Sequence, residues 1–346
     1  MMLFERKDPM THPNPLPITR RQGLAWGLAS GLAAASGLAR AQAAERVVLA
    51  GWSKPISEIT HLLVEAEKGF FKAQGIDFVY QSGNGGGDAV RNLLSGQADV
   101  AFTDPGSLFA ALDKGERLRV IYDVYPQNVF NVVSLQSRRI TRVADLKGKR
   151  IGVYSLSSGT RQNLQVLLHT AGLSEQDVTI VPTGLLNFAP LMQGQVDATA
   201  ATDTGLMVGR QRGLGEVHVM EVRQHLNLSS DVLVVREETY QNRKPLLRRL
   251  LKAFADSALW MQRQPEEAAR LAVRHAIDGQ NEATNLEVIK LRNASSASPL
   301  TQRQGPGAID TATLQKGVQA YRALGVLSRE IPVADFVATD LLPGKP

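Results

Sequence analysis

Two short turns rich in glycine and hydroxyl residues are the segments of this sequence best suited to binding chemistry. Each follows an expected strand and precedes an expected helix, so unpaired backbone N–H groups at the helix start face the turn. Glycine also lets a backbone approach a ligand closely. The turns therefore predict a site for polar or anionic groups, with ordinary helix capping as the alternative for the second turn. Their candidate ligand-binding residues are Gly85, Gly86, Gly87, Ser157, Ser158, Gly159 and Thr160.

Four more side chains are candidates for the same site. Asp104 and Asp203 each follow an expected strand, and either one can accept a hydrogen bond from a ligand or cap the helix that follows. Trp52 lies in the loop after the first strand and can stack on a planar ring, while His61 is the histidine best placed to touch a ligand. Because two carboxylates would repel a bare anion, we expect an organic ligand with both a donor end and an acceptor end.

Composition excludes several classes of function. The chain has 346 residues and no cysteine, so disulfides, thiolate nucleophiles and cysteine-ligated metals are excluded. The histidines show neither metal-ligand spacing nor a triad pattern, so no metal, cofactor or catalytic residue is predicted. The net charge is +6, and no basic stripe interleaves with aromatic residues. We therefore expect no binding of nucleic acid.

The first 43 residues have the features of a cleaved export signal. Arg20 and Arg21 precede an uncharged stretch, residues 23–39, which ends near the small residues Ala41 and Ala43. This order is typical of a secretory signal peptide, and the paired arginines favour the Tat route. A membrane anchor is the alternative, but the apolar stretch is short and rich in small residues. We therefore expect a periplasmic mature chain that begins at residue 44.

Strands and helices alternate through most of the mature chain. Apolar runs at residues 46–51, 76–80 and 100–103 are separated by helical segments, and the same alternation returns between residues 150 and 211. Such alternation predicts parallel α/β sheets with ligands at the carboxyl ends of the strands. From residue 244 onward the sequence is mainly helical, with apolar residues three and four apart.

Three motifs resemble the nitrate, sulfonate and taurine group of periplasmic solute-binding proteins, which includes a branch for thiamine-pyrimidine precursors. They are Glu-Lys-Gly-Phe-Phe-Lys-Ala-Gln-Gly at residues 67–75, Ala-Asp-Leu-Lys-Gly-Lys-Arg-Ile-Gly-Val at residues 144–153, and a Gly-Gln-x-Asp pattern at 96–99 repeated at 194–197. The resemblance covers roughly residues 47 to 259. It implies a two-lobed periplasmic binding protein of type II, with a central sheet in each lobe and two chain crossings that form a hinge.

The resemblance also implies the arrangement of the chain along its length. We expect residues 44–132 and 228–346 to form the first lobe and residues 133–227 to form the second. Enzymes of this superfamily, a thiamine-pyrimidine synthase and a desulfinase, depend on cysteines that this chain lacks, so catalysis is not expected.

The resulting functional hypothesis is the solute-binding component of an ABC importer. It would capture a small organic anion or zwitterion, similar to a sulfonate or taurine, and deliver it as a monomer to a membrane permease. Two alternatives stay open: a ligand that is a pyrimidine or an aromatic carboxylate, and a periplasmic sensor of the same fold.

Overall fold

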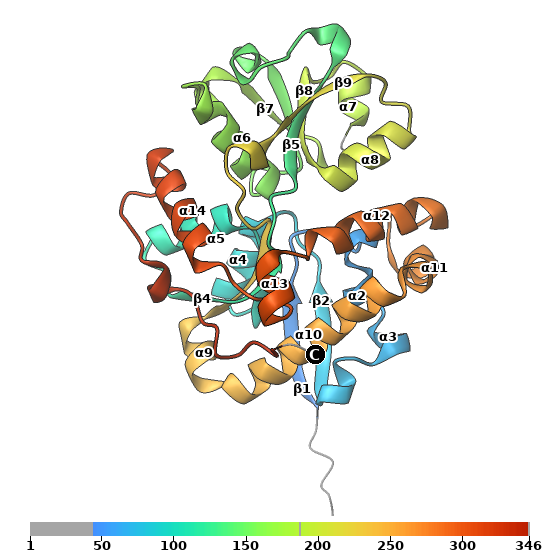
Figure 1. The fold of residues 1–346 in the computed structure, drawn as a ribbon, viewed down its shortest axis with the longest axis vertical. Helices are drawn as coiled ribbons and strands as arrows, with labels where there is room; N and C mark the ends of the chain where they lie inside the picture. The colour runs from blue at the N-terminus through green and yellow to red at the C-terminus, as the bar shows by residue number, and fades with distance from the viewer. Residues whose placement is uncertain (1–43, 187, 345–346) are drawn as a thin grey trace, which may run out of the picture. The chain divides into compact units, whose positions relative to one another are not determined.

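Two five-stranded sheets, each flanked by helices, form the body of the protein (Figure 1). The computed structural model describes residues 44–186 and 188–344, so the predicted signal peptide lies outside the described residues. We call the two halves built on these sheets the first lobe and the second lobe. The chain crosses from the first to the second between β4 (Leu118–Tyr125) and β5 (Phe130–Leu135). It returns between β9 (Val217–Glu221) and β10 (Asp231–Arg236), which confirms the predicted two-lobed α/β architecture with two crossings.

The sheet of the first lobe is mixed rather than parallel. Its strand order is β2-β1-β3-β10-β4, with β1 at Glu45–Ala50, β2 at Ile76–Gln81 and β3 at Val100–Thr103. The first three strands are parallel, as predicted, but the returning strand β10 inserts beside β3 and runs antiparallel to it. The beginning of β10 therefore lies beside the end of β3, which decides the composition of the site described below.

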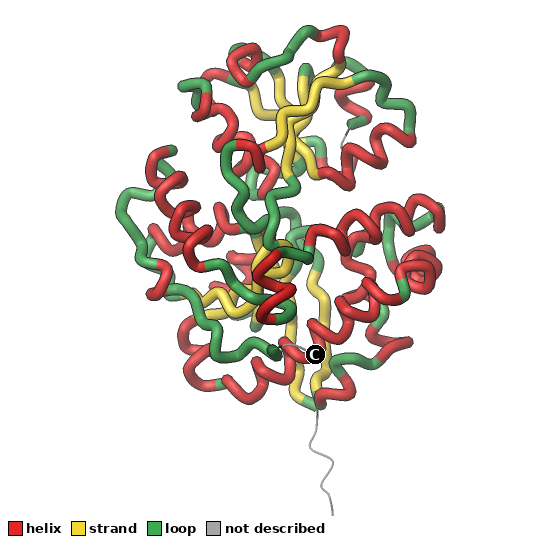
Figure 2. The backbone as a smooth tube through the Cα atoms, viewed as in Figure 1, coloured by secondary structure: helices red, strands yellow, loops and turns green. Residues whose placement is uncertain are grey.

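Alternating side chains of these strands enter two apolar layers. Leu49 and Leu233 face one layer with the long helix α10 (Lys244–Arg263), whereas Ala50 and Val234 face the other. The second layer is completed by α4 (Gly86–Leu94), α5 (Pro105–Asp113) and α14 (Thr311–Ala323), which Figure 2 shows on the opposite side of the strands from α10. This alternation follows from the two-residue period of a strand, and it holds α4 and α5 rigidly against the sheet.

The second lobe repeats the design. Its sheet has the order β7-β6-β8-β5-β9, with β6 at Arg150–Val153, β7 at Thr179–Pro182 and β8 at Ala198–Thr202. Helix α6 (Gly159–Thr170) packs on one face through its leucines, and α7 (Ala189–Met192) and α8 (Asp203–Gln211) pack on the other. Here β5 is the antiparallel insertion, pairing with β8.

The C-terminal region is helical, as predicted. Helices α9 (Glu237–Asn242), α10, α11 (Pro265–His275) and α12 (Glu282–Ser295) follow one another, and the short helix α13 (Pro299–Gln304) comes after them. The helical segment expected between the first two strands is not one helix but four short pieces. These are η1 (Ser57–Ile59), α2 (Thr60–Leu63), α3 (Glu65–Lys68) and η2 (Lys72–Gln74), and the left-handed Gly69 ends the third.

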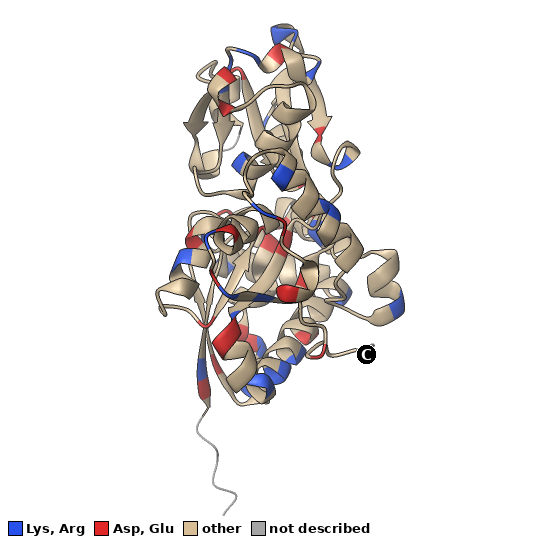
Figure 3. Cartoon of the chain, turned by 90° about the vertical axis from the view of Figure 1, so that its left-hand side faces the viewer, with Lys and Arg blue, Asp and Glu red and all other residues tan. Residues whose placement is uncertain are grey.

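Two surface properties bear on function. No helix within residues 44–186 and 188–344 has the length and apolar character needed to cross a membrane. Charged residues of both signs are spread over both lobes on the face drawn in Figure 3.

Candidate functional site

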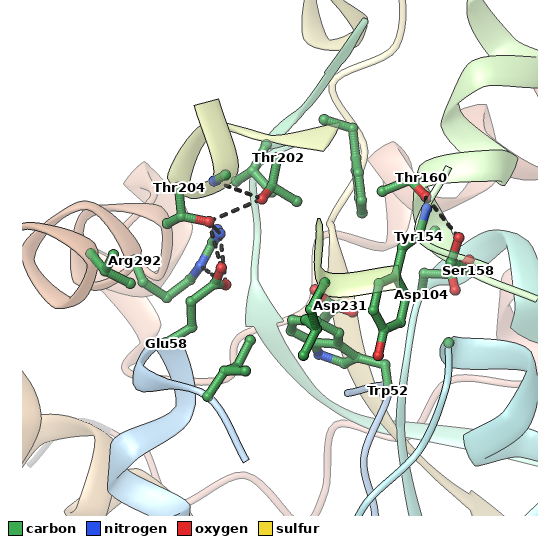
Figure 4. Close-up of a pocket in the computed structure, with 18 of the residues that line it drawn as sticks. Trp52, Glu58, Asp104, Tyr154, Ser158, Thr160, Thr202, Thr204, Asp231 and Arg292 are labelled. Atoms are coloured by element: carbon green, nitrogen blue, oxygen red, sulfur yellow. Dashed lines mark hydrogen bonds and ion pairs between the residues drawn. The ribbon is translucent and has the colours of Figure 1, made fainter. Parts of the chain in front are cut away.

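A cavity of about 140 Å³ is lined by both lobes (Figure 4). Its wall comes from the segments that follow β1, β2, β3, β6, β7 and β8, from the beginnings of β5 and β10, and from Asp278 and helix α12. These are the loop edges at which a ligand of an α/β sheet is expected. Seven of the residues proposed from the sequence line it: Trp52, Gly85, Gly86, Asp104, Ser158, Gly159 and Thr160.

The other four proposed residues lie outside this lining. Gly87 and Ser157 contact each other, and Asp203 is held by an arginine described below. His61 is buried in a second cavity, where its ring packs edge-on against Phe254. Burial lowers the pKa of His61 to about 3, so the ring is neutral.

Packing explains the glycines of the first-lobe turn, in addition to the close approach of a ligand that the sequence predicts. A Cβ on Gly85 would lie 2.4 Å from the carbonyl oxygen of Ser157 in the second lobe, and Gly85 has a φ of +116°. A Cβ on Gly86 would lie 2.1 Å from Oδ2 of Asp104. Side chains at these positions would therefore collide with protein atoms, so Gly85 permits close approach of the lobes and Gly86 permits close packing within the first lobe.

A set of uncharged hydrogen bonds joins the lobes at this point, which we call the glycine–serine seam (Asn84, Gly85, Gly87, Ser155 and Ser157). The backbone N–H of Gly87 donates to the carbonyl of Ser157 at 2.9 Å. The hydroxyls of Ser155 and Ser157 donate to the carbonyl of Asn84 at 2.6 and 3.0 Å. Backbone groups and small hydroxyls thus form all of these hydrogen bonds.

A charged set joins the lobes at another part of the cavity wall, and we call it the arginine cluster (Glu58, Asp203, Thr204 and Arg292). The guanidinium of Arg292 donates to Glu58 at 3.0 Å, to Asp203 at 3.1 Å and to Thr204 at 3.0 Å. Thr204 in turn donates to Glu58. The side chain of Arg292 is only 2% exposed, so both carboxylates are needed to offset its burial.

The N-terminus of α8 differs in detail from the prediction. The sequence offers Asp203 as a candidate cap of this helix, but Thr202 is the N-cap residue. The hydroxyl of Thr202 accepts from the N–H of Gly205. Asp203 accepts from the N–H of Thr204 at 2.8 Å and is left to pair with Arg292.

Two buried carboxylates lie side by side in the first-lobe wall. Asp104 follows β3 and caps α5, accepting from the N–H of Ser107 at 2.9 Å and from its hydroxyl at 2.8 Å. Asp231 is the first residue of β10, and antiparallel pairing of Val232 with Thr103 places it next to Asp104. Burial raises the pKa of both carboxyls, and Asp104 raises that of Asp231 further.

The opposing wall offers donors and apolar surface. Helix α6 begins at Gly159, and its N-cap residue Ser158 makes no side-chain capping bond, so the start of this helix, which lines the cavity, keeps N–H groups that the cap residue does not satisfy. The ring of Trp52 packs edge-on against Phe102, with centroids 6.2 Å apart, and contributes to the cavity wall. The site therefore combines hydrogen-bond donors, two carboxylates and an aromatic surface.

The sequence predictions missed several residues of this wall. Glu58, Asp231 and Arg292 come from a 3-10 helix, the start of a strand and the last turn of a helix, positions with no local binding signal. A charged residue at the end of a buried strand does offer a clue, because it needs a partner or a ligand.

The second cavity lies on the other side of Arg292 and is lined by polar groups. His61, Asp123 and Tyr125 each have a buried polar atom without a hydrogen-bond partner among the described residues. No group of three or more histidine, aspartate or glutamate side chains in the described part of the chain is arranged to hold a metal ion.

A family profile described as NMT1/THI5 like matches residues 56–268. The riboflavin-binding protein RibY of Chloroflexus aurantiacus is 25% identical over 305 residues, covering 87% of this chain and 87% of that protein.

Solved structures show the same fold at lower identity. The alkanesulfonate-binding protein SsuA of Xanthomonas axonopodis pv. citri, bound to MOPS, superposes with a TM-score of 0.67 at 17% identity, covering 85% of this chain and 98% of that one. The desulfurization enzyme DSZB superposes with a TM-score of 0.55 at 17% identity, covering 86% and 97%. The fold is therefore shared by binding proteins and by an enzyme.

Proposed function

The chain belongs to the NMT1/THI5-like family, and from that premise we propose that it is the solute-binding component of an ABC importer. It captures a small organic solute between its lobes and presents it to a membrane permease. The observation that carries this proposal is a cavity lined by both lobes, with hydrogen bonds between the lobes at the glycine–serine seam and the arginine cluster. Closure of two lobes on a solute produces a form that a permease can distinguish from an open one.

The wall of the cavity favours a zwitterion over a simple anion. Four carboxylates line it, from Glu58, Asp104, Asp231 and Asp278, against two guanidinium groups. One of these, Arg292, is already paired, and the other, Arg212, is exposed. The start of α6 can hold an acceptor end of the solute, while the carboxylates need a donor end. A taurine-like zwitterion has both ends, whereas an alkyl sulfonate has only the first.

The cavity has room for an organic solute. Its 140 Å³ is well above the roughly 10 to 15 Å³ that one buried water needs, so a solute of the size of an amino acid or a single six-membered ring fits.

A second candidate is a planar heterocycle or aromatic carboxylate, favoured by the position of Trp52 in the wall. A sensor that presents the bound solute to a membrane receptor would use the same cleft. Deleting the permease separates the two roles, because uptake of the solute then stops if the protein serves transport.

The proposal includes export to the periplasm and a mature chain starting at residue 44, with lobe boundaries near residues 132 and 228. Recovery of the expressed full chain from the periplasm, followed by N-terminal sequencing, tests both export and the cleavage site. A chain retained in the cytoplasm with its first residues intact contradicts this part of the proposal.

A thermal-shift panel tests the binding function. The exported protein is unfolded and refolded to remove bound solute, then heated with sulfonates, taurine, nitrate, amines, aromatic carboxylates and pyrimidines. A solute at a hundredfold its dissociation constant stabilises the folded state by about 2.7 kcal/mol, which raises the melting temperature by several degrees. A flat panel contradicts the binding of small organic solutes of these classes.

A further inference from the structure

The carboxyl of Asp231 lines the cavity without a protein partner. The residue is 7% exposed, and its side chain accepts no hydrogen bond from any residue in the described part of the chain. Because an ionised carboxylate in so buried a position is costly without a donor, a solute that brings N–H donors or positive charge to this point would be stabilised by it.

The other carboxylates of the cavity are already occupied. Glu58 pairs with Arg292, and Asp278 accepts from the N–H and the hydroxyl of Ser57. Asp104 accepts from the N–H and the hydroxyl of Ser107. Asp231 thus differs from these carboxylates because it has no such partner. Asp104 beside it adds a second negative charge.

The two arginines of the cavity wall do not pair with Asp231. Arg292 is turned toward Glu58 and Asp203, and its guanidinium stacks over Tyr125 at 5.0 Å. Arg212 is exposed at the end of α8. Two carboxylates are too few oxygen ligands for a divalent cation cage, which takes six or more.

We infer that Asp231, with Asp104 beside it, is the subsite for a positively charged nitrogen of the solute, a protonated amine or an amidinium. This inference rests on the proposed function and names the chemical class of its ligand. Trp52 lines the same cavity, so a carbon skeleton attached to the nitrogen would have the indole ring as an apolar surface within that cavity (Figure 4). Any acceptor end of the same molecule would then reach the start of α6.

Matched pairs of probes that differ in this nitrogen test the subsite. Isothermal titration at pH 7.5 compares taurine with ethanesulfonate, and benzamidine with benzamide. We expect the charged member of at least one pair to bind at least tenfold more tightly to the wild type. In Asp231→Asn we expect that preference to fall to within twofold, since the isosteric amide has no charge.

Asp123→Asn is the matched control. It also replaces a buried carboxylate near the cleft, on the neighbouring strand β4, but Asp123 lines the second cavity and not this one. The control should keep the wild-type preference within twofold. Melting temperatures of both variants verify that they are folded, and we expect neither to fall below the wild type at pH 7.5.

Each other outcome counts against the subsite. Equal or tighter binding of the uncharged member overturns it, as does an Asp231→Asn variant that keeps the preference. If neither pair binds, while the thermal-shift panel yields a solute without a protonated nitrogen, the subsite is overturned and the proposed function stands. If the panel is also flat, both fall.

Discussion

The two contacts between the lobes differ in their chemistry, because one is neutral and the other is charged. The glycine–serine seam uses backbone groups and small hydroxyls, whereas the arginine cluster uses a buried guanidinium between two carboxylates. Neutral hydrogen bonds contribute about 1 kcal/mol each and are easily exchanged for water. A buried ion cluster contributes little net stability, but loss of one member leaves charges unpaired. The seam should therefore tolerate change, and the cluster should not.

Replacement of Arg292 should have the largest effect. Arg292→Met leaves Glu58 without its buried counter-ion, and we expect the free energy of unfolding to fall by about 3 to 5 kcal/mol. The control Arg322→Met breaks an ion pair with Glu330 in which both side chains are more than half exposed, so its loss should stay below about 1 kcal/mol. Urea unfolding measures both, and equal losses would show that the cluster is an ordinary surface contact.

The sequence predicted the two turns of the glycine–serine seam but not the arginine cluster. The seam comes from two turns with local signals, glycines and hydroxyls before helices, so both turns were predicted. The arginine cluster joins residues 58, 203 and 292, and only the folded chain brings these together. The family resemblance was confirmed because each of its motifs is a continuous stretch of sequence that can be recognised without the fold. Asp231 was missed because its position depends on an antiparallel insertion, while the alternation of strands and helices suggested parallel strands.

A buried carboxyl that lines the second cavity together with Arg292 should make the stability of the protein depend on pH. Asp123 and Arg292 both line the second cavity, and burial raises the pKa of Asp123 to about 7 from an unfolded value of about 4. Below pH 4 the carboxyl is protonated in both states, so it has no effect. As pH rises from 4 to 7 the unfolded state ionises first, and the free energy of unfolding falls.

Asp123→Asn should remove that slope. We expect the variant to match the wild type at pH 4 and to exceed it by about 2 to 4 kcal/mol at pH 8. Urea unfolding at several pH values gives the difference. A difference that is constant with pH would show that Asp123 is ionised throughout this range in the folded protein.

A side chain at Gly85 should strain the seam and separate the lobes. Gly85→Ala adds a Cβ 2.4 Å from the carbonyl of Ser157 at a φ of +116°. Gly96→Ala is the matched control, because Gly96 has a φ of +76° with no atom near the added Cβ. Both should lose about 1 to 3 kcal/mol of stability through backbone strain.

Only Gly85→Ala should also change the distance between the lobes. The chain contains no cysteine, so spin labels can be placed at Lys114→Cys and Lys147→Cys, exposed positions in the first and second lobes. Electron paramagnetic resonance should give a longer label distance for Gly85→Ala than for Gly96→Ala. The same distance in both would assign the glycine to local backbone conformation alone.

The smallest expected effect belongs to one hydroxyl of the seam. Ser157→Ala removes the bond from its hydroxyl to the carbonyl of Asn84 and leaves the backbone bond to Gly87 in place. A loss of about 1 kcal/mol would lower the ratio of closed to open protein about fivefold, and solute affinity by a similar factor where open protein predominates. The control Ser95→Ala removes a hydroxyl bond within the first lobe, to the carbonyl of Asn92, so its affinity should not change. If Ser157→Ala lowers affinity as strongly as Arg292→Met, the seam and the cluster act as one unit, and the contrast between them fails.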